Sequence, residues 1–272
     1  MMFRAAIAAL ALTLPAAAVA HSFWLQPADH TPQQGEALLV AFKVGDVGAQ
    51  GAEANDWGLY WERIVSLRLF GPTGVTDQQS AVRTTGRNEA GSAVIAVPGP
   101  GTYVLAFESN SSFSELEAER FNRYLDHVGL SAIAEHREAS GTTGGSGTEL
   151  YSRRAKTIFQ VGDLQTRNVT QPVGQTLEIV PSENPFSMGE GEPLPLVILW
   201  RGQPLAGATL EVSALDGSGE LATYISDAYG NVVIPAQSGT AMLYSVVWGV
   251  PAPNDSRADY LTVFASLTIR PL

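Results

Sequence analysis

The side chains in this 272-residue sequence best suited to hold a transition metal are its four histidines, His21, His30, His127 and His136. The chain has no cysteine, so thiolate metal sites and disulfides are excluded. If His21 becomes the first residue, it offers an α-amine and an imidazole to one ion. A second imidazole would complete an all-nitrogen site suited to Cu(II) or Ni(II).

The first twenty residues have the pattern of a secretory signal, and this pattern makes His21 the expected first residue. Arg4 precedes an apolar run over residues 5–14, and the small-residue site Ala18-Val19-Ala20 follows. Without a cysteine there is no lipid-modified cleavage site. We therefore expect a periplasmic protein that is not a lipoprotein, with the signal peptide at residues 1–20.

The second imidazole must come from one of the remaining histidines. His127 falls at the end of one expected helix and His136 inside the next, and a turn at Gly129 would bring them together. The sequence thus predicts His21, His127 and His136 as metal ligands. In the alternative interpretation, His21 packs with the first strand, His127 is a cation at a helix C-terminus, His136 is a surface residue, and His30 lies in a loop.

Tyr151, Arg153, Arg154 and Lys156 form a basic cluster in an otherwise acidic chain. Such a cluster could bind a carboxylate or a phosphate. We favour an internal network of ion pairs with Glu149, Glu178 or the acidic helix, which would join the two halves of the chain.

The overall charge and the absence of known catalytic motifs narrow the function. A net charge of −11 repels nucleic acid and anionic membranes, and no segment after the signal reaches the roughly 18 apolar residues of a membrane span. There is no Gly-x-Ser-x-Gly elbow, phosphate-binding loop, His-Glu-x-x-His helix or dinucleotide fingerprint. We therefore expect no enzymatic activity, no nucleic-acid partner and no membrane insertion.

The elements that would position these residues are mostly short strands. Alternation in residues 64–69 has the strand period of two, and similar runs recur to residue 107. Helical spacing appears over residues 114–129, with Ser114 and Glu117 as a possible capping box and Gly129 as a left-handed cap, and a second helix is expected over 131–138. Residues 140–147 have the composition of a flexible loop, and residues 151–161 resemble a closing strand.

We predict a mainly β protein with two β-sandwich domains. The first spans residues 21–172 and carries a helical insertion near 114–138. The second, residues 173–272, has about seven short strands, as in immunoglobulin-like or transthyretin-like sandwiches. Modules of this second kind usually have a supporting or presenting role and not a catalytic one.

Several motifs also resemble a known family. They are the opening His-Ser-Phe-Trp-Leu-Gln-Pro at His21, Phe-Asn-Arg-Tyr-Leu at Phe121, Tyr-Ser-Arg-Arg-Ala-Lys at Tyr151, Asn-Pro-Phe at Asn184, and Ser-Asp-Ala-Tyr-Gly at Ser226. In this order they resemble a bacterial periplasmic family of domains of unknown function associated with nickel and cobalt transport (NikM-like). Ser22 and the pair Asp126-His127 depart from the family pattern, which puts its metal ligands in doubt here.

The residues and the resemblance together predict an exported periplasmic binding or accessory protein for a divalent metal ion. Nickel, cobalt or copper is the candidate ion, and an envelope transporter or receptor is the candidate partner. One alternative is a non-enzymatic interaction or structural module of the envelope. A further alternative is a copper-dependent polysaccharide oxidase that uses an amine and two imidazoles.

Overall fold

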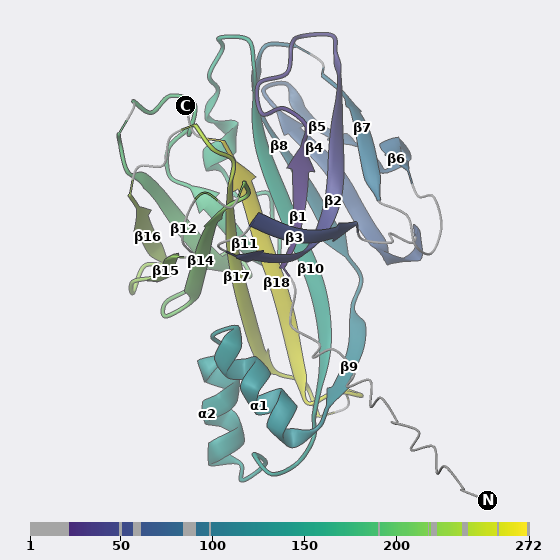
Figure 1. Cartoon of the computed structure of the whole chain (residues 1–272), viewed down its shortest axis with the longest axis vertical. Helices are drawn as coiled ribbons and strands as arrows, with labels where there is room; N and C mark the ends of the chain where they lie inside the picture. Colours follow the sequence, from purple (N-terminus) through teal and green to yellow (C-terminus); the bar gives the residue numbers. More distant parts are fainter. Residues whose placement is uncertain are drawn as a thin grey trace, which may run out of the picture.

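The computed structural model describes residues 22–48, 51–56, 61–83, 91–97, 99–189, 191–216, 218, 222–235, 239–254 and 256–270. Within them the chain is mainly β, with three sheets and a pair of short helices, as predicted (Figure 1). Neither helix has the length or the apolar run that a membrane span requires.

The central sheet has more strands than either of the other two sheets, and both halves of the chain contribute strands to it. Its strands follow the order β15-β14-β17-β18-β10-β8-β4-β5, and β9 pairs with the start of β10. The strand bounds are β4 (Ile64–Gly71), β5 (Gly74–Asp77), β8 (Gly101–Ser109), β9 (Ser112–Leu116), β10 (Gly147–Val161), β14 (Thr209–Ala214), β15 (Ala222–Ile225), β17 (Met242–Pro251) and β18 (Tyr260–Ile269).

Two smaller sheets pack against opposite faces of the central sheet. The first sheet contains β1 (Ser22–Pro27), β2 (Ala37–Gly48), β3 (Gly51–Asp56), β6 (Val82–Arg83) and β7 (Ser92–Ala96). The third contains β11 (Leu177–Pro181), β12 (Leu194–Trp200), β13 (Gln203–Pro204) and β16 (Asn231–Ile234). Short 3-10 turns lie at Trp61–Arg63, Gln79–Ala81 and Arg167–Thr170.

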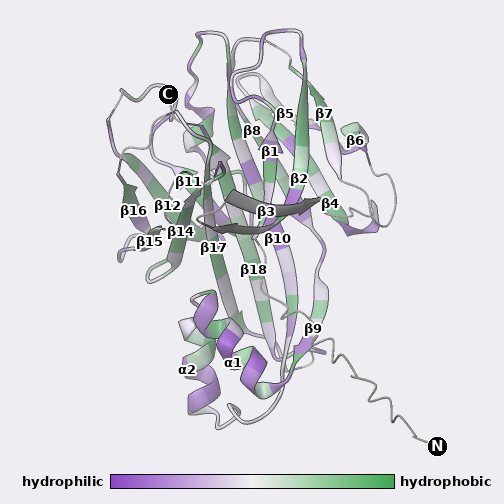
Figure 2. Ribbon diagram, viewed as in Figure 1, coloured by the Kyte–Doolittle hydropathy of each residue, from purple (hydrophilic) through white to green (hydrophobic). Residues whose placement is uncertain are grey.

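Strand β8 buries side chains on both faces of the central sheet. Tyr103, Leu105 and Phe107 point into the core under the first sheet, whereas Val104 and Ala106 point into the core under the third sheet. A strand buried on both faces reads as an unbroken apolar run, because successive side chains alternate between faces. Figure 2 shows hydrophobic residues along the strands and hydrophilic ones over much of the helices.

Both predicted sandwiches are present, and they share the central sheet. Strands β10 and β18 pair in parallel, from Glu149 opposite Tyr260 to Thr157 opposite Thr268. Strand β1 also reaches β18, because Ser266 and Thr268 donate their hydroxyl hydrogen bonds to the carbonyls of Phe23 and Leu25. The predicted boundary at residues 172 and 173 falls between the last 3-10 turn and β11.

The helical insertion consists of α1 (Ala118–His127) and α2 (Ser131–Ala139). It covers the lower end of β10 and β18 in Figure 1, where Phe121 and Ile133 pack with Tyr260 and Phe264. Gly129 has φ of 70° and ends α1 as predicted. The amide of Leu130 bonds to the carbonyl of Leu125, 2.9 Å away, which is the hydrogen bond of a Schellman cap.

The predicted capping box at Ser114 and Glu117 is wrong. Ser114 belongs to β9, where it lies opposite Glu149, and the helix begins only at Ala118. Glu117 occupies the N-cap position without a side-chain hydrogen bond. Pairing with β10 extends the backbone through Leu116, which takes precedence over the helical spacing that begins at Ser114.

The ion-pair interpretation of the basic cluster is confirmed. Lys156 Nζ lies 2.8 Å from Glu178 Oε1, and both side chains are buried. This pair joins β10 to β11, and Arg154 pairs with Glu108 of β8 at 3.4 Å. The guanidinium of Arg153 also lies over aromatic rings, 5.8 Å from the ring centroid of Phe23.

Candidate functional site

The three predicted metal ligands are not brought together among the residues that the structure describes. His21 lies outside those residues, and His127 is exposed at the end of α1. His136 lies on α2, where its Nδ1 forms a 3.2 Å hydrogen bond with the hydroxyl of Tyr260. Across the described ranges, no group of three or more His, Cys, Asp and Glu side chains could hold a metal ion.

His30 lies in the loop between β1 and β2, as predicted, and its side chain is buried there. Its Nδ1 lies 2.8 Å from the carbonyl oxygen of Ile158, and its own carbonyl accepts the amide of Gln160. Burial lowers the pKa of His30 below its ordinary value, and the hydrogen bond to Ile158 opposes this shift. The residue therefore anchors the chain after β1 to the end of β10.

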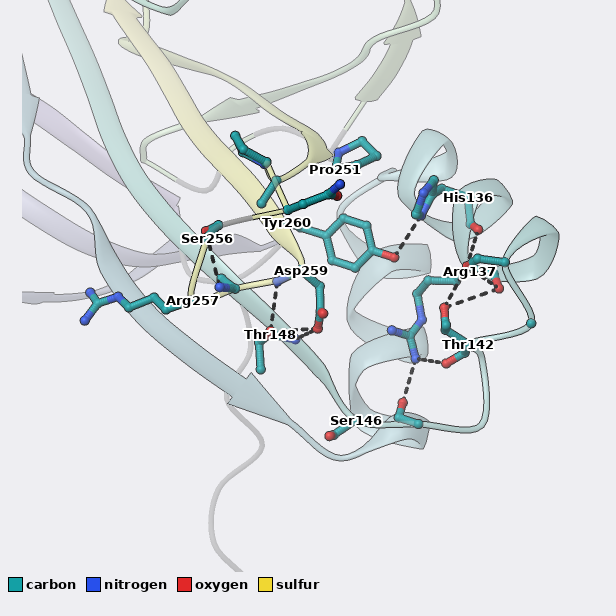
Figure 3. A pocket seen from close by; sticks show the side chains of 17 residues that line it. His136, Arg137, Thr142, Ser146, Thr148, Pro251, Ser256, Arg257, Asp259 and Tyr260 are labelled. Atoms are coloured by element: carbon teal, nitrogen blue, oxygen red, sulfur yellow. Dashed lines mark hydrogen bonds between the residues drawn. The ribbon is translucent and has the colours of Figure 1, made fainter.

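An open pocket of about 920 Å³ lies where the helical insertion meets the turn between β17 and β18. We call it the groove. One wall is α2 with the loop that follows it, and the other is the β17–β18 turn (Figure 3). Its lining residues are His136, Arg137, Ser140, Gly141, Thr142, Gly145, Ser146, Thr148, Pro251, Ala252, Pro253, Asn254, Ser256, Arg257, Ala258, Asp259 and Tyr260.

Arg137 fixes the helical wall of the groove. The side chain is only 1% exposed, and its Nη2 donates to the carbonyls of Thr142 at 2.9 Å and Gly145 at 2.7 Å. Its Nε donates to Asn122 at 3.1 Å, and its guanidinium lies 4.9 Å from the ring centroid of Phe121. The glycine-rich segment expected to be a flexible loop is therefore bound to the helix by a buried arginine.

Asp259 fixes the opposite wall. Its Oδ2 accepts hydrogen bonds from the amide and the hydroxyl of Thr148, at 2.9 and 2.6 Å. Thr148 is the second residue of β10 and Asp259 immediately precedes β18, so the parallel pairing of these strands brings the two residues together. Both walls are thus held by side-chain hydrogen bonds, as expected of a preformed binding site.

Beside the groove, a buried polar cluster lies under α1. The hydroxyl of Tyr124 donates to Glu149 Oε2 at 3.1 Å, and both residues are buried. Burial raises the pKa of Glu149 above its ordinary value, while the hydrogen bond from Tyr124 and the positive charge of Arg153 oppose the shift. Burial also raises the pKa of Tyr124, and the neighbouring Glu149 charge raises it further. This cluster links the insertion to β10. Neither Tyr124 nor Glu149 lines the groove.

Sequence reasoning missed the groove because its walls come from segments about a hundred residues apart. Two local signals were present, namely the serine- and glycine-rich residues 140–147 and the proline-rich turn that begins at Pro251. Each predicts a surface loop, but neither indicates that the two loops face each other.

Comparison with known proteins gives a family but no characterised relative. The family model described as a domain of unknown function (DUF4198) matches residues 18–247. No curated protein matches the chain.

Two solved structures are similar only at low scores. Dimeric latent PorU from Porphyromonas gingivalis is 12% identical with a TM-score of 0.20, over 90% of this chain and 20% of the PorU chain. The D0-D1 domain of intimin is 14% identical with a TM-score of 0.21, over 92% of this chain and 97% of that one. The chain thus spans about one fifth of the length of PorU, and we draw neither fold nor function from matches at these scores.

Proposed function

The chain belongs to the DUF4198 family of domains of unknown function, and from that premise we propose that it is an exported binding protein without enzymatic activity. Its ligand occupies the groove. The observation that carries this proposal is the construction of the groove, whose two walls are fixed by Arg137 and by Asp259 with Thr148. The signal-like residues 1–20 support export to the periplasm.

Rigid polar walls favour binding because the protein gives up little conformational freedom when a ligand enters. The lining consists mainly of small hydroxyl side chains, backbone and prolines. Ser140 donates to the backbone carbonyl of His136 and not to its ring, and the ring of this histidine is hydrogen-bonded to Tyr260. This lining supports recognition of a polar molecule rather than chemistry upon it.

Equilibrium dialysis tests the proposal. The wild-type protein is dialysed against a small-molecule extract of the producing organism, and mass spectrometry identifies compounds enriched on the protein side. Ser146 is exposed and lines the groove, so the indole of Ser146→Trp should obstruct it and abolish the enrichment. Gln203→Trp, at an exposed position on β13, is the matched control and should keep it. If neither the wild type nor Gln203→Trp enriches any compound, the proposal is overturned.

As a second function we propose that this chain binds a transition-metal ion, with nickel, cobalt or copper as the candidates. The observation that favours it is the imidazole of His136 at the groove, where Tyr260 orients Nδ1 and Nε2 has no hydrogen-bond partner among the described residues. Metal-binding histidines are typically oriented in this way through their second nitrogen. The NikM-like motifs of the sequence support the same ion class and an envelope transporter or receptor as partner.

Isothermal titration separates the metal proposal from the groove proposal. A chain that begins at His21 is titrated with Ni²⁺, Co²⁺ and Cu²⁺ beside a chain with one additional alanine before His21 and beside His136→Gln. Tight binding that the added alanine abolishes would support an N-terminal site, and its loss in His136→Gln would add His136 as a ligand. An absence of binding at micromolar concentration would refute the metal proposal and leave the groove proposal intact.

A further inference from the structure

The groove contains one buried cationic side chain with an unused hydrogen-bond donor. Arg137 uses Nε and Nη2 on Asn122 and the loop carbonyls, whereas its Nη1 has no hydrogen-bond partner within the described residues. In Figure 3 this third guanidinium nitrogen points away from the loop, toward the side of the groove where Tyr260 and Asp259 lie. A guanidinium that is 1% exposed and lacks one partner is a preformed donor for an oxygen of a ligand.

Asp259 supplies the complementary acceptor. Its side chain is exposed, and the two hydrogen bonds that it accepts from Thr148 both end on Oδ2, which holds the carboxylate in place. Within the described residues no hydrogen bond ends on Oδ1. The groove therefore presents a fixed donor on one wall and a fixed acceptor on the other.

Arg257, the other charged side chain of the lining, does not add a second positive group to this part of the groove. The guanidinium of Arg257 lies 5.7 Å from the ring centroid of Phe113, and Figure 3 shows it directed away from His136 and Arg137. The remaining polar side chains of the lining are hydroxyls, the amide of Asn254 and the imidazole of His136, whose Nδ1 is hydrogen-bonded to Tyr260. One positive and one negative group thus face the groove.

A ligand with a single net charge would be attracted by one of these groups and repelled by the other. A neutral ligand rich in hydroxyl groups satisfies both, because each hydroxyl both donates and accepts. A volume of about 920 Å³ lies near the upper end for small-molecule sites, which suits a ligand longer than one sugar ring.

We propose that the groove binds a neutral oligosaccharide, with Arg137 donating to one of its hydroxyl oxygens and Asp259 accepting from another. This inference rests on the proposed function, because it names the ligand class of the same groove. The proposed ligand is a sugar without net charge. Binding of acidic sugars or of zwitterionic peptides is an alternative outcome of the test.

The test uses an array of neutral oligosaccharides, acidic oligosaccharides and short peptides, followed by titration of the best binder. We expect binding to a neutral oligosaccharide, with a dissociation constant that changes less than about twofold between 50 and 500 mM salt, because no net charge is screened. Asp259→Asn should weaken binding about tenfold or more, since it replaces a charged acceptor by a neutral one of the same shape. Asp227→Asn, at an exposed turn that does not line the groove, is the matched control and should bind like the wild type.

Arg137→Lys completes the test because it keeps the charge but lacks the planar fork. If this variant unfolds the loop, Asp259→Asn still decides the result. Binding only to acidic sugars or peptides would overturn the saccharide proposal, and so would binding to nothing on the array. In either case, enrichment of another compound by wild type but not by Ser146→Trp would leave the proposed function standing.

Discussion

Removing Glu178 should destabilise the protein more than removing Lys156, although the two side chains form one ion pair. Glu178 Oε1 accepts Lys156 Nζ at 2.8 Å and the amide of Val173 at 2.7 Å, and Oε2 accepts the amides of Gly174 and Gln175. The carboxylate therefore has four donors, whereas the ammonium has one acceptor among the described residues. Burial lowers the pKa of Lys156, and the Glu178 charge opposes this shift.

The expected magnitudes follow from the partners that each substitution leaves behind. Lys156→Met leaves the carboxylate with three backbone donors, so we expect the low end of the range for a broken buried pair, about 3 kcal/mol. Glu178→Ala leaves a buried ammonium without a counter-charge, and the loss of acceptors for buried amides adds about 1 kcal/mol or more. The total for Glu178→Ala should reach about 5 kcal/mol.

Urea unfolding of the two single variants and the double variant measures this difference. The double variant should recover part of the loss, because it removes the uncompensated ammonium. Matched substitution of the exposed pair Arg123 and Glu119 of α1, whose side chains are 66% and 83% exposed, should cost less than about 1 kcal/mol. Our reasoning would be refuted if Lys156→Met cost as much as Glu178→Ala, or if both cost less than about 1 kcal/mol.

Three other predictions concern pH, backbone conformation and a buried hydrogen bond. The folded pKa of His30 lies below its unfolded value of about 6.5, so the unfolded chain binds the proton first as pH falls. The free energy of unfolding should therefore decrease below that pH. In urea titrations, His30→Gln should flatten this pH dependence. Gly129→Ala should cost at least about 1–2 kcal/mol, because φ is 70° and the added Cβ would also lie 2.8 Å from Thr209 Oγ1. Gly144→Ala, with open space around its Cβ, should change the thermal midpoint little. Tyr124→Phe removes the donor to Glu149 and should lower the free energy of unfolding by about 2 kcal/mol; an unchanged value would place that hydroxyl in solvent.

The sequence predicted those features that depend on neighbouring residues. Gly129 ends α1 because a glycine after a helical stretch adopts the left-handed conformation at low cost. An internal ion-pair network was expected for the basic cluster at residues 151–156, with Glu149, Glu178 or the acidic helix as partner, because buried charges require counter-charges; the structure pairs Lys156 with Glu178. Both signals can be read without knowing which strands are adjacent.

Features that depend on strand pairing were not predicted. Ser114 was assigned to a helix because its pairing with β10 cannot be seen in local spacing. The shared central sheet was missed for a similar reason, since an apolar run such as β8 has the same appearance whether it lies in one sandwich or between two. The groove requires knowledge that Thr148 and Asp259 are adjacent, and only the pairing of β10 with β18 provides it.

The position of β18 in the central sheet also sets the order in which the chain can fold. This last described strand pairs with β10 and β17 and holds the carbonyls of Phe23 and Leu25, so both cores await residues 260–269. Contacts between such distant segments slow folding, because a large loop must close before they form. The two halves of the chain should therefore reach their native state together, and only once residues 260–269 are available.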